Sequence, residues 1–235
     1  MLFAFFGAAA GLLGIGTITQ INGISSAAED FFDPSHSFTI TLFGVQYSWV
    51  LVITAIVVTL CVGLVVIGGI KRISSVSQIV VPFMVIIYLL GSIIVLAVNV
   101  QQIPHVFSMI FTNAFTGTAA VGGFAGAAFR EVIQSGIARG VFSNESGLGS
   151  APIAAAAAKT EWPARQGLVS MTGTFIDTII VCNLTGFCIL SSGSWLDEGV
   201  EGVLVTSHAF QSGFFFAPAL GQFLLMLCLI FFAFT

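Results

Sequence analysis

Runs of apolar residues long enough to cross a lipid bilayer constrain this chain more than any other feature. A membrane-spanning helix needs about 20 apolar residues, whereas a transmembrane barrel shows alternating segments of about ten. Charged residues make up only 7% of the 235 residues and hydrophobic residues 57%, against roughly a quarter charged residues in soluble domains. We therefore predict an all-α, polytopic membrane protein. Its residues 1–235 form a single transmembrane domain, with spans near 2–24, 46–70, 77–98, 105–129, 167–191 and 214–235.

The basic residues all fall on one side of this predicted topology. Each follows either the second or the fourth span: Lys71, Arg72, Arg130, Arg139, Lys159 and Arg165. Loops rich in Lys and Arg remain in the cytoplasm, so we predict a multi-pass protein of the cell membrane with these loops inside. The opposite loops carry acidic residues such as Glu29, Asp30 and Asp33. No basic stripe is present that could neutralise the phosphates of a nucleic acid.

Glycines interrupt the fourth span near residues 116–126. A helix in lipid can lose backbone hydrogen bonds only where protein or a polar cavity receives the freed groups. Half-helix N-termini suit a carboxylate, and unwound carbonyls with Thr hydroxyls suit a hard cation such as sodium. Broken helices bind substrates and ions in secondary transporters, although small residues also let helices pack closely. The candidate residues at the break are Thr116, Thr118, Gly122, Gly123, Phe124 and Ala125.

The first span carries polar residues on one face. Thr17 and Gln20 share that face by their helical spacing. Gln20 lies about five residues before the predicted outer loop, deep enough that an unpaired amide would cost free energy. Two interpretations stay open: Gln20 lines a binding cavity, or it forms a hydrogen bond between helices.

The fifth span contains Asp177, the acidic residue that lies within a predicted span, and Thr174 one turn before it. Ionisable groups inside the membrane are costly and mark an ion path or a buried pair. No Lys or Arg lies in another span, so a cation, a proton or hydroxyl donors must satisfy the carboxylate. Asp177 is therefore either part of an ion site or a structural hydrogen-bond anchor.

Three segments together resemble a known family. FTGTAAVGGFAGA, GIARGVFSNESGLGSAPIAAAAAKT and LVSMTGTFIDTIIVC closely resemble the alanine or glycine:cation symporters, the sodium:alanine symporter family. The resemblance implies sodium-coupled uptake of alanine or glycine into the cytoplasm by alternating access, with sodium as the coupling ion and no other cofactor. It also implies a leucine-transporter-type fold with five-plus-five inverted repeats, in which the spans here are core helices three to eight.

The resemblance further implies roles for individual residues. Thr17 and Gln20 would contact the amino acid from helix three, and Thr118 with Gly122–Ala125 would meet it at the broken helix six. Sodium candidates are Thr116, Thr174, Asp177 and Thr235. The Gly-Thr-Gly-Asn-like segment of helix one and the Trp-containing continuation of helix eight do not occur here, so we expect this chain to need the remainder of a longer protein.

Some of these sequence features also occur in other functional classes. A cation channel also uses broken helices, and a proton could replace sodium as the coupling ion. An enzyme is not predicted, because no Ser/His/Asp grouping, phosphate loop or His cluster occurs. Alanine and glycine differ by one methyl group, which is worth only about 1–3 kcal/mol in a pocket, so the sequence leaves the choice between them open.

Overall fold

The computed structural model describes residues 2–12, 17–35, 37–42, 44–115, 134, 136–138, 140, 143 and 155–233. The chain divides into two compact units. Unit 1 comprises Met1–Leu13 and Val100–Phe187, and unit 2 comprises Gly14–Asn99 and Cys188–Thr235.

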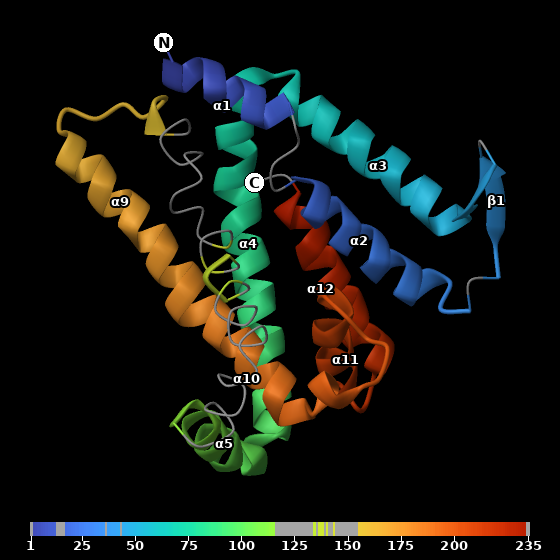
Figure 1. Cartoon of the computed structure of the whole chain (residues 1–235). Helices are drawn as coiled ribbons and strands as arrows, with labels where there is room; N and C mark the ends of the chain where they lie inside the picture. The colour runs from blue at the N-terminus through green and yellow to red at the C-terminus, as the bar shows by residue number, and fades with distance from the viewer. Residues whose placement is uncertain are drawn as a thin grey trace. The chain divides into compact units, whose positions relative to one another are not determined.

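The described part of the chain is mostly helical, which confirms the prediction of a helical protein. A short antiparallel hairpin departs from the all-α prediction. In chain order the elements are α1 (Leu2–Leu12), α2 (Thr17–Phe32), β1 (Thr39–Leu42), β2 (Val45–Ser48), α3 (Trp49–Val66), α4 (Gly69–Val98), η1 (Val100–Gln102), α5 (Ile103–Phe115), α9 (Pro163–Phe175), η2 (Ile176–Cys182), α10 (Asn183–Ser192), η3 (Ser194–Leu196), α11 (Val203–Gly213) and α12 (Pro218–Phe232), as labelled in Figure 1.

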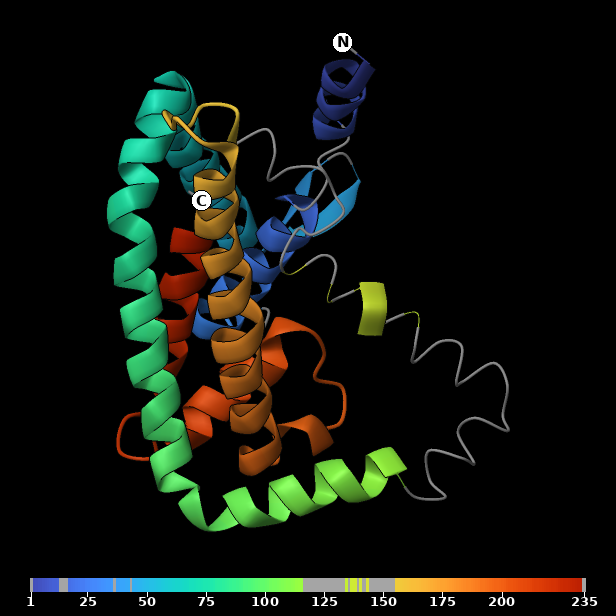
Figure 2. The ribbon, with the colours of Figure 1, turned by 90° about the vertical axis from the view of Figure 1, so that its left-hand side faces the viewer.

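Three helical stretches among the described residues are long and apolar enough to cross a membrane: Trp49–Val66, Gly69–Val98 and Pro163–Ser192. The second of these is the long continuous helix α4 of Figure 2. On α3, four aliphatic side chains recur at helical spacing and are each more than half exposed: Ile53, Ile56, Leu60 and Leu64. An apolar stripe left exposed along a helix face indicates contact with lipid rather than water.

The hairpin and a serine cap fix the start of α3 in unit 2. Thr39 pairs with Ser48 and Leu42 with Val45, and Gly44 closes the turn with a positive φ of 82° that favours glycine. Ser48 then caps α3, because its Oγ accepts a hydrogen bond from the Val50 amide at 3.2 Å. The hairpin therefore leads directly into a membrane-length helix.

The core of unit 2 forms where α4, α10, α11 and α12 meet. Phe210 on α11 is 1% exposed, and its ring stacks on Tyr88 of α4 with centroids 5.6 Å apart. Gly221 of α12 permits this packing, because a Cβ there would lie 2.5 Å from the Phe210 carbonyl oxygen. The backbones of α11 and α12 thus touch with no side chain between them.

In unit 1, α9 passes without a break into η2, a π-helical segment, and on into the first residues of α10, up to Phe187. Phe107 of α5 packs against Phe187 with ring centroids 4.7 Å apart. The first predicted span, residues 2–24, holds α1 and the first half of α2, and α2 then continues to Phe32. Glu29 and Asp30, which the sequence analysis placed in a loop, therefore lie in the last turn of α2.

Candidate functional site

Asp177 lies in the π-helical segment η2. A π-turn contains one residue more than an α-helical turn and is frequent at functional sites. Here the wider turn places residues five apart on the same face, so Asp177 and Cys182 lie near each other, with Cys182 Sγ 4.0 Å from Asp177 Oδ2. The Asp177 side chain is half-buried. The structure therefore sets this carboxylate on an irregular turn and not on a plain α-helix.

A residue distant in the sequence completes this cluster. Ser143 Oγ donates a hydrogen bond to Asp177 Oδ2 at 2.6 Å and lies 3.5 Å from Cys182 Sγ. Ser143 was not among the residues predicted to form a site. The family-like segment GIARGVFSNESGLGSAP was the signal that could have identified it.

The chemistry of this cluster suits a cation more than a bond-breaking step. In the described part of the chain, the partners of the Asp177 carboxylate are a hydroxyl and a thiol, both neutral. Carboxylate and hydroxyl oxygens are the ligands that hard cations prefer. Thr174, also half-buried, lies three residues before Asp177 and so belongs to the same stretch of helix. Among the described residues, the Ser143 hydroxyl and the Cys182 thiol donate to the Asp177 carboxylate.

Two side chains that follow η2 in the sequence donate hydrogen bonds to backbone carbonyl oxygens within η2. Asn183 Nδ2 donates to the carbonyl oxygens of Thr178 at 3.1 Å and Ile179 at 3.0 Å. Thr185 Oγ1 donates to the Val181 carbonyl at 2.8 Å. Backbone acceptors in the membrane interior need partners, and these two side chains supply them. Their contribution is therefore to the stability of η2.

In unit 2, one face of α2 carries the predicted residue Gln20. Gln20 is half-buried, and Gly23 follows it on the same face, where an added Cβ would lie 3.9 Å from Val203 of α11. Ala27, at the next position of that face, packs in a cluster with Met226 of α12. Gln20 thus begins the face that α2 turns toward α11 and α12.

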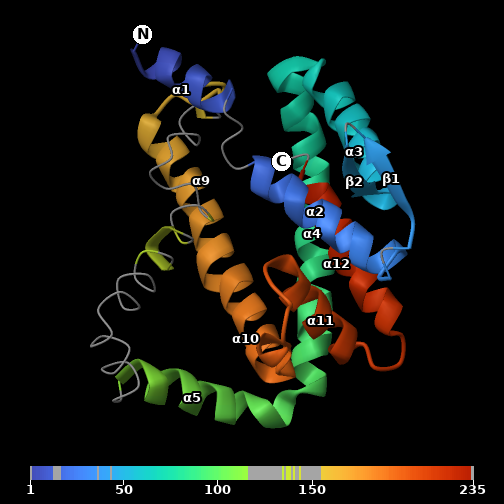
Figure 3. The same ribbon diagram turned by 45° about the vertical axis from the view of Figure 1, so that its right-hand side comes forward.

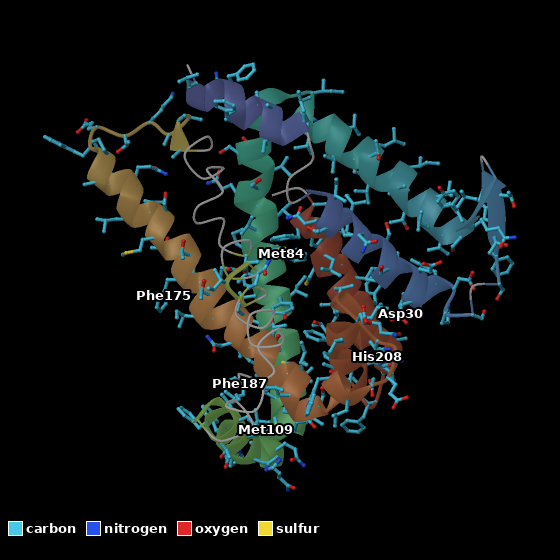
Figure 4. All side chains as sticks on the ribbon, viewed as in Figure 1. Asp30, Met84, Met109, Phe175, Phe187 and His208 are labelled. Carbon is cyan, nitrogen blue, oxygen red and sulfur yellow. The ribbon has the colours of Figure 1, made fainter. Side chains whose placement is uncertain are left out.

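The face of α2 that begins at Gln20 ends at Asp30, a residue that was not predicted to belong to a site. Asp30 Oδ2 accepts hydrogen bonds from Ser207 Oγ of α11 at 3.1 Å and from Gln222 Nε2 of α12 at 3.2 Å. Figure 3 shows the three helices side by side, and Figure 4 labels Asp30 on α2. A helix usually ends before a proline, so Pro34 was a signal that α2 extends through this residue.

A second carboxylate, Asp33, organises the turn after α2. It is 3% exposed and accepts hydrogen bonds from the backbone amides of Phe38 and Ser37, each at 3.0 Å. These bonds favour the charged form of the carboxylate and so hold the pKa of Asp33 below its ordinary value of 3.8. The bond from the Phe38 amide has the larger effect, and the bond from the Ser37 amide has the next largest. Asp33 is therefore a structural anchor for the approach to β1.

All the predicted residues at the broken helix, and the sodium candidate at position 235, lie outside the described residues. This is true of Thr116, Thr118, Gly122, Gly123, Phe124, Ala125 and Thr235. Thr17 lies at the first position of α2, and its side chain is likewise outside the described part. Of the predicted residues, the structure therefore describes the surroundings of Gln20, Thr174 and Asp177.

The chain is similar to a family of membrane carriers over its whole length. The model of the sodium:alanine symporter family matches residues 1–235. A transporter from Haemophilus influenzae is 45% identical over 234 residues, covering 100% of this chain and 48% of that protein. The sodium/alanine symporter AgcS from Methanococcus maripaludis is 41% identical over 236 residues, covering 99% of this chain and 47% of that protein.

A third relative is named for a different ion dependence. The sodium/proton-dependent alanine carrier protein of Bacillus sp. strain PS3 is 36% identical over 197 residues, covering 78% of this chain and 43% of that protein. This chain thus spans about half the length of these curated relatives. With a family match over every residue and relatives at this identity, the chain belongs to the sodium:alanine symporter family.

Proposed function

We propose that this chain forms part of a secondary active transporter that couples the entry of sodium to the uptake of alanine or glycine. The family match over all 235 residues carries this proposal. The named relatives add to it, because AgcS is a sodium/alanine symporter and the protein of Bacillus sp. strain PS3 is an alanine carrier. The family is a transporter family, which gives no support to an enzymatic role.

In this proposal, the residues that contact the amino acid are those that the family resemblance implies, in α2 and in the fourth predicted span. Thr17 and Gln20 contact it from α2, and Thr118 with Gly122–Ala125 contact it through backbone amides and carbonyls. Gln20 is half-buried at the start of the face of α2 that is directed toward α11 and α12. A polar amide in that position can bind the ammonium or carboxylate group of a small amino acid.

The coupling ion binds near Asp177 in this proposal, with Thr116, Thr174 and Thr235 as further candidate ligands. The support is the pair of oxygen atoms already brought together, Asp177 Oδ2 and Ser143 Oγ at 2.6 Å. Both are hard donors of the kind that sodium takes. Sodium, when bound, would compensate the charge of the carboxylate, whose partners in the described part of the chain are a hydroxyl and a thiol.

Architecture and orientation complete the proposal. The chain would supply core helices three to eight of a leucine-transporter-type fold, with its Lys and Arg loops in the cytoplasm. Alternating access would then move the substrate inward, and the residues that the relatives possess beyond this chain would supply the rest of the site. The positions of the Lys and Arg residues support the orientation, and the family resemblance supports the architecture.

Proton coupling is the second candidate, favoured by one observation. The relative from Bacillus sp. strain PS3 is named as sodium/proton-dependent. A single half-buried carboxylate such as Asp177 can take either a proton or a sodium ion. The coupling ion is thus the element of the proposal that most needs measurement.

Equilibrium binding of labelled alanine to the purified, complete protein tests the proposal. Binding should saturate, should tighten as sodium is raised with potassium as the control cation, and should be displaced by unlabelled alanine or glycine. Linkage requires that alanine tighten sodium binding by the same factor. Alanine binding that is indifferent to sodium but tightens at low pH would replace sodium by a proton. An absence of alanine binding in both conditions would reject the substrate class.

A further inference from the structure

One oxygen atom of Asp30 joins three helices of unit 2. Asp30 Oδ2 accepts from Ser207 Oγ on α11 at 3.1 Å and from Gln222 Nε2 on α12 at 3.2 Å. Ser207 is 2% exposed, so its hydroxyl is directed into the protein and depends on this acceptor. Both donors are neutral, and both reach the same carboxylate oxygen.

Asp30 and Gln20 lie at the two ends of one face of α2. Ten residues separate them, which corresponds to about 15 Å along the helix axis. Between them, Gly23 approaches Val203, and Ala27 packs in the cluster that contains Met226. The face that begins at the proposed substrate contact therefore ends at the carboxylate that binds α11 and α12.

The contacts along this face are of two kinds. Gly23 and Ala27 are small and make apolar contacts, which resist separation but are not directional. Hydrogen bonds weaken steeply when their angle changes, so the two bonds at Asp30 resist rotation of α2 about its axis. Both bonds connect α2 to another helix of unit 2.

The helices that carry the donors are themselves held closely. A Cβ at Gly221 of α12 would lie 2.5 Å from the Phe210 carbonyl oxygen of α11, and a Cβ at Gly213 of α11 would lie 2.6 Å from Val95 Cγ2 of α4. Such close packing leaves little room for α11 to move against α4 or α12. Ser207 and Gln222 thus provide a firm support, and Asp30 attaches α2 to it.

We infer that Asp30 is a positioning residue for substrate binding: through Ser207 and Gln222 it fixes the rotation of α2 and so the direction in which Gln20 faces. This inference rests on the proposed function, in which Gln20 contacts the transported amino acid. Asp30 itself does not touch the substrate. Its carboxylate is used here as a hydrogen-bond acceptor and not as a charge.

A pair of substitutions at Asp30 separates these two uses in the complete protein. Asp30→Ala removes the shared acceptor and should raise the KM for alanine uptake by roughly fivefold or more, the equivalent of one lost hydrogen bond. The maximal rate per molecule should change less than the KM. Asp30→Asn can place its amide oxygen where Oδ2 lies and keep both bonds, so its KM should stay within about twofold of the unmodified protein.

The donors and an exposed acidic residue supply the controls. The double substitution Ser207→Ala with Gln222→Leu should reproduce the KM of Asp30→Ala, whereas Glu198→Ala, in the exposed turn before α11, should have no effect. If Asp30→Asn raises the KM for alanine as much as Asp30→Ala does and also alters the sodium dependence of uptake, the inference is overturned in favour of an ionic role. A fall in the maximal rate alone, with an unchanged KM, would also overturn it.

A distance measurement tests the position of α2 without transport. Spin labels at Asn22→Cys on α2 and Ala219→Cys on α12, both exposed positions, report their separation after Cys61 and Cys182 are replaced by Ser. Asp30→Ala should broaden or shift the distance distribution, and Asp30→Asn should preserve it. An unchanged distribution in Asp30→Ala rejects the inference even if alanine proves not to be the substrate. If the spin-label distances are unchanged in all variants and the unmodified protein takes up no alanine, both the inference on Asp30 and the proposed transport of alanine are rejected.

Discussion

Ser143 Oγ donates a hydrogen bond of 2.6 Å to Asp177 Oδ2, although 34 residues separate them in the sequence. The bond connects the segment after the fourth predicted span to the π-helical turn η2. Cys182 Sγ lies 3.5 Å from the same hydroxyl. A carboxylate held by neutral donors in this way can exchange them for a cation without moving far.

Removing the charge at Asp177 should weaken sodium coupling. For Asp177→Asn, we expect the sodium concentration that gives half-maximal alanine uptake to rise by about tenfold or more, because a charged ligand is replaced by a neutral one. Ser143→Ala keeps the charge and should have a smaller effect. Cys61→Ala on α3, which lies outside this cluster, is the control. An unchanged sodium dependence in Asp177→Asn would remove Asp177 from the ion site.

Truncating Gln20 should weaken binding of the amino acid. Gln20→Ala should raise the alanine KM roughly fivefold to tenfold, the cost of one or two lost hydrogen bonds. The control is Asn22→Ala, which removes an exposed amide two residues along the same helix and on another face. Uptake kinetics at saturating sodium measure both variants. Equal KM values for the two would assign Gln20 to helix packing.

Adding one methyl group at Gly221 should destabilise unit 2. The Cβ of Gly221→Ala would meet backbone, 2.5 Å from the Phe210 carbonyl oxygen, so α11 or α12 must shift at a cost of about 1–3 kcal/mol. Gly63→Ala on α3 meets nothing within 4 Å and should be neutral or stabilising, because Ala favours a helix by up to about 1 kcal/mol. Thermal unfolding in detergent compares them. A Gly221→Ala protein as stable as Gly63→Ala would show that α11 and α12 do not pack this closely.

The turn after α2 should weaken in acid through Asp33. The Phe38 and Ser37 amides lower the pKa of Asp33 below 3.8, so its stabilising effect is fully present above that pH and is lost as the pH falls toward the lowered pKa. Asp33→Asn should therefore unfold at a lower temperature than the unmodified protein at neutral pH. The difference should shrink below about pH 4. A difference that stays constant over this range would mean that the charge of Asp33 contributes nothing.

The sequence predicted the helical class because long apolar runs have few other solutions in lipid. It failed at the hairpin, where residues 46–48 were assigned to a span although β2 contains them. The β-branched residues of Thr39–Leu42 and the glycine at position 44 were usable signals. The hairpin was missed because apolar content, rather than alternation along the chain, decided where the second span began.

The site was only partly predictable, for physical reasons. Asp177 was identified because a carboxylate in an apolar span is costly, but the π-helical turn that carries it has no simple sequence pattern. Ser143 and Ser207 are ordinary serines until the fold brings them to Asp177 and Asp30. Asp30 was missed because acidic residues near a span end usually mark a loop, whereas α2 continues to Phe32.

Uptake of labelled alanine by proteoliposomes that contain the complete protein tests sodium-coupled symport most directly. Three conditions are compared: an inward sodium gradient, an inward proton gradient without sodium, and no gradient. We predict saturable accumulation above the external concentration with the sodium gradient alone. Accumulation driven equally well by the proton gradient, or alanine entry that only equilibrates and never saturates, would contradict sodium-coupled symport.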